Sequence, residues 1–159
     1  MTIKVGDHLP ETTFSTPTPD GPKPATTAEV FGGKTVALFA VPGAFTPTCS
    51  ARHLPGFIDN AAAFKAKGVD TIVCVAVNDA FVMKAWAAAT PGAEAVTFLA
   101  DGNGAFTKAV GLELDAAKFG MGQRSQRYSM LVVDGVVKQL NVEQGGFEFS
   151  TAEHLLGQL

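Results

Sequence analysis

The side chain with the clearest chemical potential is Cys49, which closes the segment 41–49 (VPGAFTPTC). An apolar run at residues 35–40 precedes it and predicts a buried strand. Thr46 is a favoured N-cap residue and Pro47 suits the first helical position, so Cys49 is expected in the first turn of a helix. Unpaired N–H groups and the positive end of the helix dipole favour a thiolate there, and a thiolate is the nucleophilic form of cysteine.

Three other roles for Cys49 can be weighed against the residues around it. A lone cysteine is more often a small buried apolar residue than a nucleophile. His53 lies four residues later on the same helical face, as in a Cys–His pair, but no partner motif accompanies it, so His53 is expected to be structural. Thr46 stands where a Cys-x-x-Cys motif would have its first cysteine, which excludes a paired-cysteine disulfide exchanger at this site.

Composition narrows the class of protein. The 159 residues are 47% hydrophobic and 17% charged, which predicts one compact domain over residues 1–159. A formal net charge of -3 argues against nucleic acid as a partner, and the absence of an apolar run of about 18 residues argues against a membrane span. Two cysteines and three histidines form no ligand cluster, so neither a metal nor a cofactor is expected.

The first residues of the chain and its number of cysteines indicate where in the cell the protein is located. The first residues lack the charged-then-apolar pattern of a secretory signal, and two cysteines do not make a disulfide scaffold. We therefore expect a protein that is reduced at rest and located in the cytoplasm. A removed transit peptide would leave no trace, so an organelle stays an open alternative.

The elements that must position Cys49 follow an alternating order. Strands are expected at residues 35–41, 71–77 and 96–100, and a hairpin at residues 127–142 turns at Asp134-Gly135. Helices are expected at residues 46–68, interrupted or kinked at Pro55, and at 79–89, 105–110 and the C-terminal end. Short strands or an irregular hairpin are expected before residue 27. Strand–helix alternation indicates the α/β class.

At this point the chain resembles a known family. Pro42, Thr46 and Cys49 match the Pro-x-x-x-Thr-x-x-Cys signature of peroxiredoxins. The longer string at residues 41–57 is similar to the peroxiredoxin 5, or type II, subfamily, and the similarity extends to residues 77–86 and 127–130. The resemblance implies a thioredoxin-like α/β fold with a central mixed sheet flanked by helices.

The resemblance also implies roles for four residues. Cys49 would attack a peroxide and become a sulfenic acid, and Thr46 would hydrogen-bond both the sulfur and the peroxide. Pro42 would shield the cysteine from water. Arg127, immediately before Tyr-Ser-Met, would be the active-site arginine, and Arg124 is expected to be solvated or at a dimer contact. The alternatives from the residues alone are a helix cap for Thr46, a loop former for Pro42 and a solvated cation for Arg127.

The second cysteine bears on how Cys49 is restored. Many members of the subfamily resolve the sulfenic acid with a cysteine after the hairpin, but residues 143–150 contain none. Cys74 lies in the middle of a predicted strand, where a buried thiol is expected. The sequence therefore resembles a one-cysteine form regenerated by an external thiol, with glutathione and glutaredoxin favoured over thioredoxin. The resemblance also implies a homodimer. Phe45 adds weak support, because burial by a partner would explain a phenylalanine in that loop.

The leading hypothesis is therefore a thiol-dependent peroxidase that acts on hydrogen peroxide and alkyl hydroperoxides. The alternative is a redox-sensing thioredoxin-fold binding protein regulated by Cys49 oxidation. A third possibility, a non-catalytic adaptor, is disfavoured because Thr46, Cys49 and Arg127 are all present. Steady-state turnover with excess reductant separates the first two, because a sensor need not cycle fast.

Overall fold

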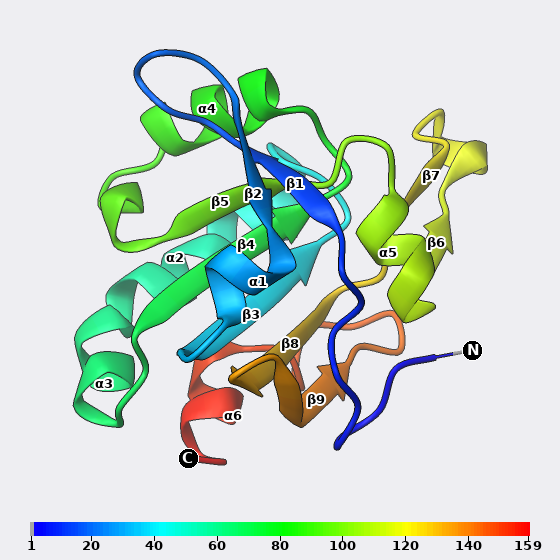
Figure 1. The fold of residues 1–159 in the computed structure, drawn as a ribbon. Coiled ribbons are helices and arrows are strands. Elements are labelled where there is room, and N and C mark those ends of the chain that lie inside the picture. The colour runs from blue at the N-terminus through cyan, green and yellow to red at the C-terminus, as the bar shows by residue number, and fades with distance from the viewer. Residues whose placement is uncertain (1) are drawn as a thin grey trace.

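The computed structural model describes residues 2–159, which form a seven-stranded mixed sheet with helices on both faces (Figure 1). The strand order is β2-β1-β5-β4-β3-β8-β9. The three central strands β5, β4 and β3 run parallel, and the outer pairings are antiparallel. This arrangement confirms the predicted α/β class. The strands are β1 (Thr13–Thr16), β2 (Lys23–Thr26), β3 (Thr35–Val41), β4 (Thr71–Ala76), β5 (Thr97–Ala100), β8 (Tyr128–Val133) and β9 (Val136–Val142).

Strand β3 lies in the middle of the sheet and is buried on both sides. Alternate β3 residues, Phe39 among them, pack into a cluster that also contains side chains of α2, α3, α4 and α6. The intervening residues, such as Leu38, pack into a second cluster with side chains of α1 and α5. A strand covered on both faces needs an unbroken apolar sequence, as this one has. The helices are α1 (Thr27–Phe31), α2 (Leu54–Asp59), α3 (Ala61–Ala66), α4 (Ala80–Ala88), α5 (Ala105–Val110) and α6 (Ala152–Leu156).

The helical segment after β3 differs from the single helix expected over residues 46–68. Helical structure begins at Pro47, passes through a π-helical stretch at Cys49–His53 and continues as α2 and α3. The Leu54 N–H reaches back five residues to the Cys49 carbonyl. Pro55 has no N–H and therefore cannot donate the next helical hydrogen bond along the chain. The predicted interruption is thus a π segment followed by a break at Asn60, not a simple kink.

A small second sheet was not expected from the sequence. Strands β6 (Glu113–Asp115) and β7 (Gln123–Ser125) pair antiparallel beyond α5. Each has only three residues, and β6 is exposed throughout, so the sequence has no apolar alternation there that would predict a strand. This sheet matters for the site because the chain leaves β7 and enters β8 through Gln126 and Arg127.

The remaining connections fit the sequence-based expectations. The β8–β9 hairpin turns at Asp134 and Gly135, whose φ angles of 47° and 78° are those of the predicted two-residue turn. Asp79 caps α4 by accepting a hydrogen bond from the Val82 N–H. The segment 143–151 joins β9 to α6. Within residues 2–159, none of the helices has the length and apolarity needed to cross a membrane.

Candidate active site

Cys49 is fully buried at the start of the π-helical stretch, and two polar groups contact its sulfur. The Thr46 hydroxyl lies 2.7 Å from Sγ, and Nη2 of Arg127 lies 3.1 Å from it. The guanidinium can only donate to the sulfur, whereas the hydroxyl can either donate or accept. The structure thus brings together three of the four residues named from the sequence.

Thr46 comes just before the first helical turn, but its hydroxyl contacts a carbonyl and the sulfur rather than a backbone N–H, as a helix cap would. It lies 2.8 Å from the Gly43 carbonyl as well as 2.7 Å from Cys49 Sγ. A hydroxyl has one proton, so it donates to only one of these acceptors at a time. With a thiolate it can donate to the sulfur. With a thiol it can accept the S–H and donate to Gly43.

Arg127 reaches Cys49 because β8 pairs with β3. Ala40 lies opposite Tyr128 in this antiparallel pair, which places the residue before Tyr128 beside the loop that follows β3. The two terminal nitrogens of Arg127 have different partners. Nη2 contacts Cys49 Sγ, and Nη1 lies 2.9 Å from Nδ1 of His53.

His53 is a buried member of the site that the sequence analysis described only as structural. Its Nε2 lies 2.9 Å from the Ser150 carbonyl, and Nδ1 faces Arg127. Burial, and secondarily the charge of Arg127, lower the pKa of His53 from 6.5 to about 3, so its ring is neutral. The four-residue spacing from Cys49 was the available signal. What the sequence lacked was the partner, 74 residues away.

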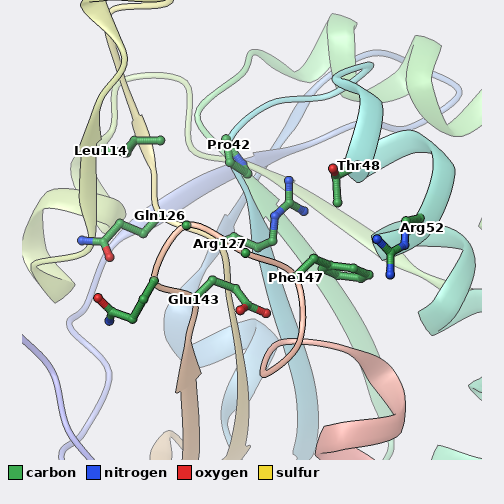
Figure 2. A pocket seen from close by; sticks show the side chains of 11 residues that line it. Pro42, Thr48, Arg52, Leu114, Gln126, Arg127, Glu143 and Phe147 are labelled. Carbon is green, nitrogen blue, oxygen red and sulfur yellow. The ribbon is translucent and has the colours of Figure 1, made fainter.

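Pro42 lines a cavity of about 620 Å³ that leads toward this cluster. Figure 2 shows Pro42, Thr48, Arg127 and Phe147 around the same opening. The ring of Phe147 lies 4.6 Å from the guanidinium carbon of Arg52 and 5.7 Å from that of Arg127. The opening is therefore bordered by two cations and an aromatic side chain. The other lining residues are Leu114, Gln126, Glu143, Gln144, Gly145 and Gly146.

Arg124 has a more specific place than the solvated or dimer-contact position expected for it. Its side chain is half-buried, with Nε donating to the Met121 carbonyl and Nη1 donating to the Pro42 carbonyl at 3.3 Å. A Cβ on Gly43 would come within 2.6 Å of this Nη1. Glycine at position 43 therefore leaves room for Arg124 to hold the loop that contains Pro42.

Glu143 organises the segment after β9. Its Oε2 accepts hydrogen bonds from the Glu148 N–H at 2.9 Å, the Ser150 N–H at 2.7 Å and the Ser150 hydroxyl at 2.7 Å. Burial by itself would raise the pKa of Glu143, but these hydrogen bonds outweigh it and the pKa is lowered. The carboxylate thereby fixes the loop that contains Phe147 and presents the Ser150 carbonyl to His53.

Cys74 lies fully buried in β4, directly opposite Phe39 of β3. Both cysteines are free thiols. Burial, and secondarily the nearby Cys49 sulfur, raise the pKa of the Cys74 thiol, which keeps it protonated and poorly nucleophilic.

Comparison with known proteins places this site in a family. Residues 4–156 match the family model described as Redoxin. Peroxiredoxin-2E-2, chloroplastic, from Oryza sativa subsp. japonica is 54% identical over 99% of this chain and 73% of its own length. Peroxiredoxin-2B from Arabidopsis thaliana is 48% identical over 99% of this chain and 98% of its own.

Solved structures agree with this assignment. The structure titled reduced Prx3 in complex with H₂O₂, from Vibrio vulnificus, is 55% identical, has a TM-score of 0.95 and covers 99% of both chains. Peroxiredoxin 5 from Alvinella pompejana is 37% identical, with a TM-score of 0.85 over 97% of this chain and 96% of that one. The predicted thioredoxin-like peroxiredoxin fold is thereby confirmed. The chain belongs to the redoxin family and, within it, to the type II, or peroxiredoxin 5, subfamily of peroxiredoxins, which are thiol-dependent peroxidases.

Proposed function

We propose that this peroxidase reduces hydrogen peroxide and small alkyl hydroperoxides at Cys49, and that glutathione with glutaredoxin regenerates it. The observation that supports the site most directly is the cluster around the sulfur. Cys49 Sγ has a hydroxyl at 2.7 Å and a guanidinium nitrogen at 3.1 Å, beside a cavity open to small molecules. The relative from Vibrio vulnificus whose structure is titled as a complex with H₂O₂ supports this substrate class.

The oxidation step follows from this geometry. The thiolate attacks the terminal oxygen of the peroxide, so an S–O bond forms as the O–O bond breaks. The leaving oxygen departs with the electron pair, takes a proton and becomes water or an alcohol, and Cys49 becomes a sulfenic acid. Arg127 and Thr46 are positioned to stabilise the charge that moves from sulfur to the leaving oxygen. Pro42, at the wall of the cavity, limits the access of water.

The regeneration step needs a thiol from another molecule. A glutathione thiol attacks the sulfenic sulfur and releases water, leaving a mixed disulfide on Cys49. A second thiol, from glutaredoxin or glutathione, then exchanges with that disulfide and restores Cys49. Two features support this route: residues 143–150 contain no cysteine, and Cys74 is buried with a raised pKa.

A homodimer is part of the proposal. Phe45 is 53% exposed in the active-site loop, and Phe81 at the start of α4 is 70% exposed. The two segments are joined because the Ala44 N–H donates to the Asn78 side chain at 2.9 Å. Exposed aromatic side chains on two segments that are joined in this way are typical of a protein interface. A monomeric mass in solution at micromolar concentration would reject the dimer.

A coupled assay tests the catalytic proposal. Peroxide consumption is followed through NADPH oxidation with glutathione, glutaredoxin and glutathione reductase, and in parallel with thioredoxin and its reductase. We expect faster turnover in the glutaredoxin system and a glutathione adduct on Cys49 by mass spectrometry. Cys49→Ser is expected to abolish turnover in both systems. Turnover supported by thioredoxin alone would refute the proposed reductant, and activity retained in Cys49→Ser would refute the site.

A further inference from the structure

We propose that Arg52 and the backbone N–H groups of Gly145 and Gly146 form a subsite that binds the glycyl carboxylate of glutathione. This inference rests on the proposed function, in which glutathione attacks the sulfenic acid of Cys49. All three residues line the cavity of about 620 Å³ that leads toward Cys49. Figure 2 shows the side chain of Arg52 at this opening, next to the ring of Phe147.

The guanidinium of Arg52 is the cation of this cavity that is still available to a ligand. It is exposed, and its guanidinium carbon lies 4.6 Å from the centroid of the Phe147 ring. Within residues 2–159 no carboxylate pairs with it, since the one ion pair found there joins Lys4 to Asp7. Arg127, the other lining cation, already uses Nη2 on Cys49 and Nη1 on His53. An anion that enters the cavity therefore meets Arg52 with its fork of donors unoccupied.

The charges that line the cavity favour an anionic thiol over a neutral or cationic one. Its lining contains two arginines and one acid, Glu143. The Glu143 carboxylate is compensated within the protein, because its Oε2 accepts from the N–H groups of Glu148 and Ser150 and from the Ser150 hydroxyl. The charge of Arg52 has no such compensation, so the opening carries an excess of positive charge that attracts an anion.

The loop before Phe147 adds two backbone donors. Within the described part of the chain, the N–H groups of Gly145 and Gly146 donate to no other residue. A Cβ built on either glycine would meet nothing within 4 Å, so the backbone is open to a close approach there. A carboxylate has two oxygens, which can accept from an arginine fork and from backbone N–H groups together. The loop and Arg52 thus offer the kinds of donor that a carboxylate uses.

The glycyl end of glutathione fits this subsite better than the γ-glutamyl end. The γ-glutamyl end has an ammonium and a carboxylate on the same carbon, so it is neutral overall, whereas the glycyl carboxylate stands alone. Glycine also follows the cysteine of glutathione directly, so its carboxylate lies within about two residue lengths, or 7 Å, of that cysteine. Arg52 comes three residues after Cys49, about one helical turn away, and its long side chain covers a similar distance.

The reaction that the subsite would serve is the formation of the mixed disulfide. The glutathione thiolate attacks the sulfenic sulfur of Cys49, so an S–S bond forms as the S–O bond breaks. Hydroxide leaves with the electron pair and takes a proton to become water. Binding of the glycyl carboxylate at Arg52 holds the attacking thiol near this sulfur and so raises the rate of the step.

The test compares glutathione with glutathione monoethyl ester, in which the glycyl carboxylate is esterified and the thiol is unchanged. Reduced protein is oxidised with one equivalent of hydrogen peroxide, mixed with either thiol and quenched with acid at increasing times. Mass spectrometry gives the rate at which the adduct forms on Cys49. The readout is the ratio of the glutathione rate to the ester rate, because a change at the sulfur itself affects both rates equally.

We expect this ratio to fall at least about fivefold in Arg52→Ala. Arg52→Lys keeps the charge without the planar fork and should give an intermediate ratio. Lys138→Ala is the matched control, since it removes an exposed positive charge that does not line the cavity, and it should keep the original ratio. Added salt should lower the ratio in the unsubstituted protein but not in Arg52→Ala. An unchanged ratio in Arg52→Ala would overturn the proposal.

Two further outcomes separate this inference from its alternatives. If neither thiol forms an adduct on the unsubstituted protein, glutathione is not the reductant, and the proposed function fails together with the subsite. A carboxylate can also arrive on the peroxide, so the oxidation step is measured with a fatty-acid hydroperoxide and with its methyl ester. If Arg52→Ala changes the acid-to-ester ratio there but not with glutathione, the subsite serves the peroxide and the assignment to glutathione is wrong.

Discussion

Nη2 of Arg127 lies 3.1 Å from the sulfur of Cys49, although 78 residues separate the two in the sequence. The contact joins the helical segment after β3 to the first residue before β8. It puts a permanent positive charge beside a buried sulfur, where the low dielectric strengthens its effect.

Arg127→Ala is expected to slow the oxidation of Cys49 about a hundredfold, the typical loss when a positioned donor is removed. Lys138→Ala is the matched control, since it removes one positive charge from an exposed position on β9. If both variants react like the unsubstituted protein, the guanidinium has no part in the chemistry.

Thr46→Val is expected to slow peroxide reduction by at least about tenfold, whereas Thr46→Ser should retain most of the activity. Valine preserves the branched shape of threonine but cannot donate to Cys49 Sγ or to the Gly43 carbonyl. Serine keeps the hydroxyl. The rate constants for peroxide oxidation of the two variants provide the measurement. Similar rates in Thr46→Val and Thr46→Ser would assign Thr46 to the local fold alone.

Cys74→Ser is expected to leave peroxidase turnover nearly unchanged, because the thiol is buried in β4 and its raised pKa keeps it protonated. Steady-state turnover with glutathione and glutaredoxin measures this. Non-reducing mass spectrometry after peroxide treatment provides the second observation. A Cys49–Cys74 disulfide in the unsubstituted protein, combined with lost turnover in Cys74→Ser, would show that regeneration is internal.

The stability of the fold is expected to fall as the pH decreases from about 6.5 toward 3. The pKa of His53 is about 3 in the folded protein and 6.5 in the reference state, so over this range the unfolded chain binds a proton that the folded ring does not. The free energy of unfolding should drop on the order of 1 kcal/mol more between pH 7.5 and 5.5 in the unsubstituted protein than in His53→Asn. The free energy of unfolding is measured by urea denaturation at each pH. If it depends on pH equally in both proteins, His53 is protonated while folded.

Much of the site follows from local sequence. The position of Cys49 after a buried strand and just inside a helical turn depends on Thr46 and Pro47, whose preferences act over a few residues. The β8–β9 hairpin follows from Asp134-Gly135 in the same way. Burial of β3 on both faces also follows, because its uninterrupted apolar run leaves no polar face for solvent.

The remaining features of the site depend on contacts between segments that are far apart in the chain. The sequence offered Arg124 and Arg127 as cations, and the family resemblance favoured Arg127. The pairing of β3 with β8 brings Arg127 to the sulfur, while β7 directs Arg124 to the Pro42 carbonyl. The role of His53 was hidden for the same reason, since its partners lie 74 and 97 residues away. Local preferences act through neighbouring backbone atoms, whereas side-chain partners across a sheet are determined only when strand order and register are set.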